Sequence, residues 1–132
     1  ANSRMLHLFA RLLETQGDIK KLTKEEKNLA RDAKNYMDRM YSRDIRIQDV
    51  AGILHVHPNY LSTLFRREYD QSPREYLRKV RMNQAKLLLA TTEYSISDIS
   101  SDVGYTNPFQ FSKVFKSCYG ISPTEYRNMR QV

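Results

Sequence analysis

The sequence predicts an all-α fold in which two helix-turn-helix units are joined by a long linker helix, with an extra helix at the N-terminus. Three observations support this fold class. Apolar residues recur at helical spacing along the chain. Only four Gly and four Pro occur, which favours ordered helices over a disordered chain. One block of sequence returns after 49 to 50 residues, and such an internal repeat predicts a repeated structural unit.

The composition limits the size of the protein and the kind of partner it has. A chain of 132 residues and 15.6 kDa is too short for a large enzyme with a separate substrate domain. The net charge of +7 favours a polyanion such as nucleic acid, although solubility alone would also account for it. The single Cys118 cannot form an internal disulfide, so a reducing, cytoplasmic setting is expected. No apolar run approaches the length of a membrane span.

Two helices are expected before the repeat. Residues 1–22 are expected to form an N-terminal helix or inter-domain linker with an apolar face. That face consists of Met5, Leu8, Phe9, Leu12 and Leu13. Whether it docks on the domain or forms a dimer interface stays open. Thr23 and Glu26 have the spacing of a capping box and predict the start of a second helix, which runs to Met40.

The repeat divides the remaining chain into two helix-turn-helix units, expected at residues 23–72 and 92–132. In both units the motif Ser-Pro-x-Glu-Tyr follows the second helix, and it starts at Ser72 and at Ser122. This motif predicts a further helix, because proline is favoured in the first helical turn. Residues 73–91 between the units are therefore predicted to form a linker helix that rises about 27 Å.

The second unit has the clearer turn chemistry. Ser95 stands three residues before an acid, which predicts a capped short helix over 96–102. Gly104 supplies the turn, where a positive φ is needed, and Asn107 caps a second helix over 108–119. The glycine that follows ends this helix.

The first unit repeats this order with less favourable residues. Helices are expected over 48–54 and 58–69, with a turn at His55 and Val56. Arg46 stands where the second unit has its capping serine, and His55 stands where it has the turn glycine. Because histidine tolerates a positive φ less well than glycine, the first unit is expected to be locally less stable.

In a helix-turn-helix unit the second helix enters the DNA major groove, so its outward face is the candidate site. Helical spacing places these apolar residues inward: Leu61, Leu64, Phe65, Phe111, Val114, Phe115 and Cys118. The outward, candidate DNA-binding residues are Asn59, Ser62, Thr63, Arg66, Phe109, Gln110, Ser112, Lys113 and Lys116. Phe109 is unusual in this set, and it either contacts a thymine methyl group or packs onto the neighbouring helix.

The sequence gives little support to other kinds of site. It contains no catalytic triad, paired acids or phosphate-binding glycine loop, so neither an enzyme nor a cofactor is expected. His55 and His57 could suggest a metal site, but their repeat partners Gly104 and Asn107 favour roles in a turn and a helix cap. Cys118 is expected to be a small buried apolar residue rather than a redox switch.

Two other classes of function stay open at this point. A helical protein-interaction module with only non-specific nucleic-acid affinity would present an acidic or apolar outward face, which this sequence lacks. A basic amphipathic protein at a membrane would need an exposed apolar stripe, whereas the core of the repeat accounts for the apolar residues here, so no membrane partner is expected. Arg78, Lys79 and Arg81 on the linker helix either contact phosphates or only face solvent.

From residue 96 to 127 the chain reads ISDISSDVGYTNPFQFSKVFKSCYGISPTEYR. With the first unit, this makes residues 44–130 closely resemble the C-terminal DNA-binding domain of the AraC/XylS family of bacterial transcription regulators. Ser100 takes the place of that family's usual alanine, a mild change. The resemblance implies seven helices, sequence-specific binding of double-stranded promoter DNA at the bacterial nucleoid, and base- or backbone-facing roles for the outward residues. It also implies contact with RNA polymerase and an N-terminal sensing or dimerisation domain.

Overall fold

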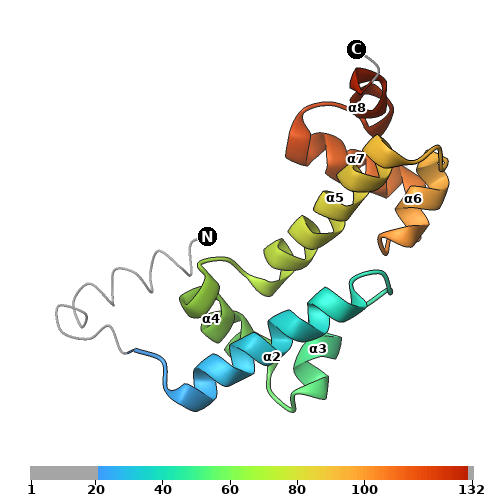
Figure 1. Ribbon diagram of the computed structural model, residues 1–132. Coiled ribbons are helices and arrows are strands. Elements are labelled where there is room, and N and C mark those ends of the chain that lie inside the picture. Colours follow the sequence, from blue (N-terminus) through green and yellow to red (C-terminus); the bar gives the residue numbers. More distant parts are fainter. Residues whose placement is uncertain (1–20, 131–132) are drawn as a thin grey trace.

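The computed structural model describes residues 21–130, and every regular element in this range is a helix (Figure 1). The seven helices are α2 Lys24–Met40, α3 Ile47–Ile53, α4 Pro58–Tyr69, α5 Pro73–Thr91, α6 Ile96–Asp102, α7 Pro108–Tyr119 and α8 Pro123–Met129. The prediction of an all-α fold with two helix-turn-helix units on a long helix is confirmed. The helix predicted for residues 1–22 falls almost entirely outside the described residues.

Three helices begin with the complete capping box that their sequences contain. At the start of α2, the Glu26 N–H donates to the Thr23 hydroxyl at 3.1 Å and the Thr23 N–H donates to the Glu26 carboxylate at 2.8 Å. Ser72 and Ser122 start α5 and α8 with the same pair of hydrogen bonds to the glutamate three residues on. These reciprocal bonds satisfy N–H groups that the helix itself cannot pair.

The two short helices, α3 and α6, are each started by one of the two bonds of a capping box. In α6, the Asp98 N–H donates to the Ser95 hydroxyl at 2.9 Å. In α3, the Arg46 N–H donates to the Asp49 carboxylate at 2.9 Å. Arg46 is thus the N-cap residue of α3, and the helix begins at Ile47, one residue earlier than predicted.

Four residues with positive φ form the turns of the two units. His55 at 60° and Gly104 at 102° lie between the paired helices, and Asp70 at 58° and Gly120 at 82° follow the second helices. The first unit therefore uses a histidine and an aspartate where the second uses glycines. This confirms the predicted placement of the turn at His55.

Each unit has its own hydrophobic core, and α5 contributes to both. The first core consists of Ala33, Met37, Val50, Ala51, Leu61, Phe65 and Leu77. The second core consists of Met82, Ala85, Leu89, Ile99, Val103, Phe111 and Phe115. The ring centroids of Phe65 and Tyr76 are 5.7 Å apart, as are those of Phe115 and Tyr126 at the equivalent place. The repeat in the sequence is therefore also a repeat in packing.

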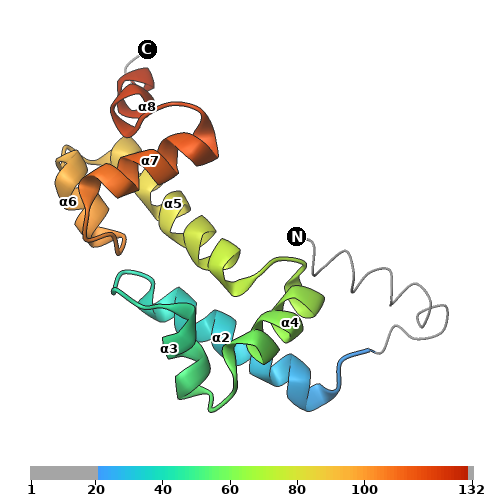
Figure 2. The same ribbon diagram turned by 180° about the vertical axis from the view of Figure 1, so that it is seen from behind.

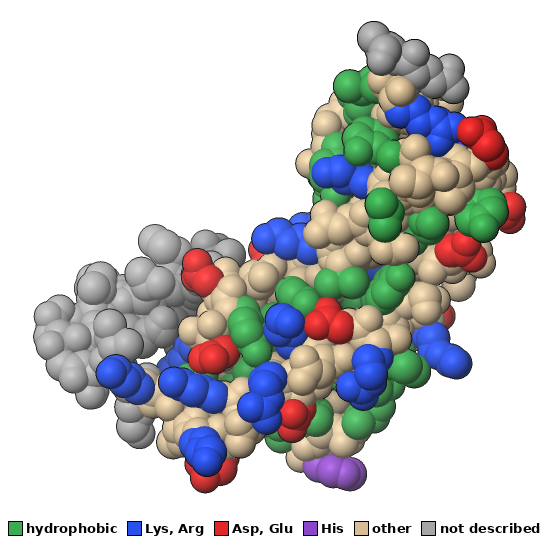
Figure 3. All heavy atoms as spheres, in the orientation of Figure 1, with side chains coloured by type: hydrophobic (Ala, Val, Ile, Leu, Met, Phe, Trp, Pro, Cys, Tyr) green, Lys and Arg blue, Asp and Glu red, His purple; other side chains and the backbone are tan. Residues whose placement is uncertain are grey.

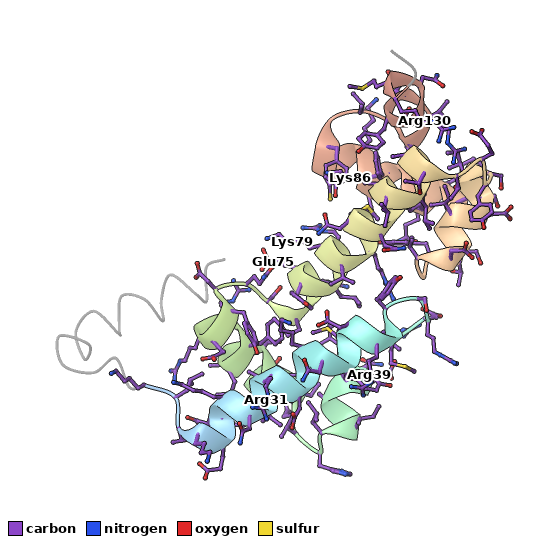
Figure 4. The ribbon with its side chains drawn as sticks, in the orientation of Figure 1. Arg31, Arg39, Glu75, Lys79, Lys86 and Arg130 are labelled. Carbon is purple, nitrogen blue, oxygen red and sulfur yellow. The ribbon has the colours of Figure 1, made fainter. Side chains whose placement is uncertain are left out.

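The end of α5 is held by Arg127 of α8 and by Arg130, the residue that follows α8. Arg130 Nη1 donates to the carbonyls of Leu89 and Thr92 at 2.6 and 2.8 Å (Figure 4). Arg127 Nη2 donates to the Thr92 carbonyl at 3.1 Å. These donors satisfy carbonyl groups that have no partner within the helix. The helix predicted over 73–91 is α5. The division of the chain into two units and a separate linker segment stays a prediction.

The two second helices, α4 and α7, lie toward the same side of the molecule. Figure 2 shows α7 crossing in front of α5 and α4 in front of α2, whereas in Figure 1 α5 and α2 are in front. Among the helices of residues 21–130, none is long and apolar enough to span a membrane.

The prediction that Cys118 is buried is wrong, because its side chain is exposed. In the last turn of α7 it is the neighbouring Tyr119 that packs inward, with its ring centroid 4.7 Å from that of Phe115. The residue equivalent to Cys118 in the first unit is Glu68, which is also exposed. A charged repeat partner was thus the signal that this position faces solvent.

Candidate nucleic-acid interface

α4 begins with a side-chain cap that leaves its first turn open to solvent. The Asn59 N–H donates to Nδ1 of His57 at 3.1 Å, so His57 is the N-cap residue. Pro58 occupies the first helical position, where its missing N–H costs nothing. The predicted capping role of His57 is confirmed.

The outward face of α4 carries the residues predicted to contact DNA. Leu61, Leu64 and Phe65 are buried, as their spacing predicts. Asn59 and Thr63 are exposed, whereas Ser62 and Arg66 are half-buried. The Thr63 hydroxyl donates to the Asn59 carbonyl at 3.0 Å, which leaves its oxygen free to accept a further bond.

α7 presents its first turn in the same manner. Oδ1 of Asn107 accepts hydrogen bonds from the N–H groups of Phe109 and Gln110 at 2.8 and 3.3 Å. Phe109 is 85% exposed, so it does not pack onto the neighbouring helix, and its contact with a thymine methyl group stays a prediction. Gln110, Lys113 and Lys116 are exposed, and Ser112 is half-buried.

The linker helix brings one more cation to this surface. Arg78 of α5 lines a hollow together with Phe109, Gln110, Lys113, Val114 and Ser117 of α7. From sequence alone, Arg78 was undecided between a phosphate contact and a solvent-facing role. The structure places Arg78 beside residues of α7, and no spacing in the sequence indicated this.

Both second helices also carry a cation close to the capping glutamate of the next helix. Arg66 Nη1 lies 3.8 Å from Oε1 of Glu75. The Ser72 N–H and hydroxyl, followed by Arg66, hold the pKa of Glu75 below its ordinary value. Lys116 likewise helps to lower the pKa of Glu125, after the bonds from its own N-cap residue. The signal in the sequence was a cation nine residues before the glutamate in both repeats.

Charge is distributed differently on the opposite face of the molecule. Figure 3 shows that Lys and Arg side chains alternate there with Asp and Glu along α2. Arg31 lies 3.8 Å from Asp32, and Lys34 lies 3.3 Å from Asp38. The sequence of α7, by contrast, contains two lysines and no acid. The α7 side is therefore the better surface for a polyanion.

Comparison with protein families gives a match to a helix-turn-helix domain over residues 50–129. The chain is 33% identical over 118 residues to the HTH-type transcriptional regulator YisR of Bacillus subtilis, which covers 89% of this chain and 41% of YisR. It is 38% identical over 101 residues to the arabinose operon regulatory protein of Escherichia coli, covering 76% of this chain and 35% of that protein. The chain thus spans about two fifths of the length of these relatives.

A solved structure has the same fold at similar sequence identity. It is the C-terminal domain of AraT, a response regulator from Geobacillus stearothermophilus. The TM-score is 0.77 at 35% identity, and the alignment covers 86% of this chain and 91% of that one. The paired helix-turn-helix units, the family match and these relatives lead to one conclusion. The chain belongs to the AraC/XylS family of transcription regulators and corresponds to its C-terminal DNA-binding domain.

Proposed function

We propose that this chain regulates transcription by binding promoter DNA with α4 and α7 in two successive segments of the major groove. The observation that carries the proposal is that the equivalent helices α4 and α7 lie toward one side of the molecule (Figure 2), and each has exposed polar or cationic residues. α5, with 19 residues, rises about 28 Å, which suits two helices that must enter grooves about 34 Å apart along B-DNA.

In α7, the first turn would recognise base edges. Gln110 can pair with N6 and N7 of adenine through its amide, and this is a common specific contact in the major groove. The exposed Phe109 ring can contact the methyl group of thymine. Lys113, about one turn further along, can reach guanine O6 and N7 or a phosphate. α7 is therefore proposed to recognise a block of DNA that contains an A·T pair.

In α4, Asn59 would take the role that Gln110 takes in α7. Its amide has the same pattern of donors and acceptors, and its exposed position in the first turn suits contact with adenine. Ser62 and Thr63 can donate to bases or phosphates. Arg66 must first exchange its contact with Glu75 for one with DNA, so its net contribution should be smaller than that of an unpaired arginine.

Two cations beside the hollow suit the sugar-phosphate backbone of the same site. Arg78 comes from α5 and Lys113 from α7, so both can contact phosphates of a strand that lies over the hollow. Phosphate contacts of this kind set the position of the protein on DNA without reading sequence. Lys116, on the same helix, is proposed as a further phosphate contact.

Other partners follow from the family and from the length of the relatives. We propose that the full-length protein carries an N-terminal sensing or dimerisation domain, because the chain aligns with about two fifths of its relatives. Regulation of a promoter also suggests contact with RNA polymerase. Both proposals place the protein at the bacterial nucleoid in the cytoplasm.

The proposal is tested by in vitro selection of duplex DNA with Gln110→Ala and Asn59→Ala. Each variant should lose base preference at one position of one block, at a cost of about 1 to 3 kcal/mol, and keep the preferences of the other block. Arg31→Ala, which removes a charge on the opposite α2 face, should leave both blocks unchanged. Equal preferences in all the proteins would contradict the proposed reading helices.

A further inference from the structure

We propose that Arg81 sets the angle between the two helix-turn-helix units and thereby the spacing between DNA blocks that the chain accepts, an inference that rests on the proposed function. Arg81 lies in the middle of α5. On one side of it Leu77 packs in the first core, and on the other Ala85 packs in the second. Its side chain contacts both units.

The guanidinium of Arg81 bonds the segment that follows α2. Nε donates to the Tyr41 carbonyl at 2.9 Å, and Nη2 donates to the Arg43 carbonyl at 2.8 Å. Tyr41 directly follows the last residue of α2, where carbonyl groups lack partners within the helix. A planar guanidinium can serve two acceptors in one fixed geometry. The end of α2 is therefore tied to the middle of α5.

The same guanidinium lies over an aromatic ring of the second unit. Its carbon is 5.4 Å from the ring centroid of Tyr105. That ring is itself 5.8 Å from Phe111 of the second core, and the Tyr105 N–H donates to the Ser100 carbonyl at 2.9 Å. Burial lowers the pKa of Arg81, and Tyr105 acts in the opposite direction. The guanidinium is thus a packed contact between units.

Gly104 brings the two backbones together at the same point. A Cβ on Gly104 would overlap the Tyr41 carbonyl oxygen and lie 2.8 Å from Nε of Arg81. Figures 1 and 2 both show the loop after α2 facing the turn between α6 and α7. The two units therefore meet at a contact that does not pass through the backbone of α5, and Arg81 lies at its centre.

A fixed angle between the units has a direct consequence for DNA. One base pair advances along B-DNA by about 3.4 Å and rotates by about 34°. Two reading helices at one angle therefore fit one spacing between their blocks. When a base pair is added or removed, one helix loses its place in the groove. Without the Arg81 contact, the units can rotate about α5 and accommodate the changed spacing.

Fluorescence anisotropy on three duplexes tests this inference: the selected two-block site, and the same site with one base pair added or removed between the blocks. The wild type should bind the altered spacings at least about tenfold more weakly than the selected site. In Arg81→Met, this ratio of affinities should fall below about threefold. Arg81→Lys should behave like Arg81→Met, because an ammonium cannot hold both carbonyls in the planar geometry of a guanidinium.

The matched control is Arg127→Met. Arg127 also donates to backbone carbonyls, those of Leu89 and Thr92, but these contacts stay within the second unit. This variant should keep the wild-type ratio even if its stability falls, because the fraction of folded protein cancels in a ratio. An unchanged ratio in Arg81→Met, or an equal loss in Arg127→Met, would overturn the inference.

A measurement without DNA separates this inference from the proposed function. Spin labels on the native Cys118 and on Asn35→Cys in α2, both exposed, report the distance between the units. Arg81→Met should broaden the distribution of distances, and an unchanged distribution would overturn the role of Arg81. If the wild type prefers no DNA site, the proposed function fails, and the width of this distribution still decides whether Arg81 fixes the units.

Discussion

His55 and Gly104 occupy the same place in the two units, and both have a positive φ, 60° for the histidine and 102° for the glycine. The first unit therefore forms its turn with a residue that has a Cβ, in a region of φ and ψ that favours glycine. The two turns have the same form, but the positive φ costs more free energy at His55 than at Gly104.

Replacement of His55 by glycine should raise the melting temperature and leave DNA binding intact. The left-handed conformation costs a residue with a Cβ about 1 to 2 kcal/mol, which His55→Gly removes. The greater conformational freedom of glycine in the unfolded chain offsets about 0.5 to 1 kcal/mol of this gain. Calorimetry should record a rise of a few degrees, roughly 2 to 6 °C. His55→Ala, which keeps a Cβ, should give no such rise. A clear fall for His55→Gly would be incompatible with the turn as described.

Gly104→Ala should destabilise the protein more than Gly120→Ala, although both glycines have positive φ. A Cβ on Gly120 meets no heavy atom within 4 Å, whereas one on Gly104 overlaps the Tyr41 carbonyl oxygen. The conformational cost of about 1 to 2 kcal/mol is common to both, and overpacking adds about 1 to 3 kcal/mol at Gly104 alone. Urea unfolding measures the difference, and equal losses would contradict the close approach of the units.

The capping glutamates should make stability fall at acidic pH. The N–H of the N-cap residue is the main cause that holds the pKa of Glu26, Glu75 and Glu125 below the ordinary 4.5. Since the folded pKa is the lower one, this stabilisation is complete above the unfolded pKa and is lost as the pH falls through the folded pKa. The urea midpoint should therefore drop between about pH 5 and pH 3.

Glu75→Gln gives the matched variant for this pH dependence. Glutamine can still accept the Ser72 N–H in a capping box but does not titrate in this range. Its urea midpoint should fall less steeply with acid than that of the wild type. Parallel curves for the two proteins would rule out a contribution from Glu75.

Removal of the reading cations should weaken DNA binding. Lys113→Ala should cost about 1 to 3 kcal/mol if the lysine contacts a base edge, and it should reduce the salt slope by about 1 if it contacts a phosphate. Arg66→Ala should cost less, because Arg66 already contacts Glu75 in the free protein. Titration at several salt concentrations measures both effects, and full affinity in both variants would refute the placement of these reading faces.

Much of the fold was predictable because the sequence contains an internal repeat, so each helix-turn-helix unit could be compared with the other. The repeat aligned His55 with Gly104 and His57 with Asn107, and both the turn and the cap are found there. Local hydrogen bonds decide such positions, so sequence spacing identifies them. The burial of Cys118 was predicted wrongly, because helical spacing alone does not report whether a neighbouring element covers the last turn.

The contact between the units was not predictable in this way. Arg81 donates to carbonyls 38 and 40 residues earlier, much as Arg130 of the second unit donates to carbonyls 38 and 41 residues earlier. The position of Arg78 beside α7 was not predictable either, because it depends on how α5 crosses that helix. A backbone carbonyl carries no side-chain signature, so a sequence pattern cannot reveal that it accepts a bond from a distant arginine.

In vitro selection from random duplex DNA, at near-physiological salt and with the bound pool sequenced, tests whether both α4 and α7 read DNA. We expect enrichment of two blocks whose centres lie about one helical turn, or about 10 base pairs, apart. Retention of DNA without any enriched sequence, or enrichment of a single block, would contradict a protein that reads DNA with both α4 and α7.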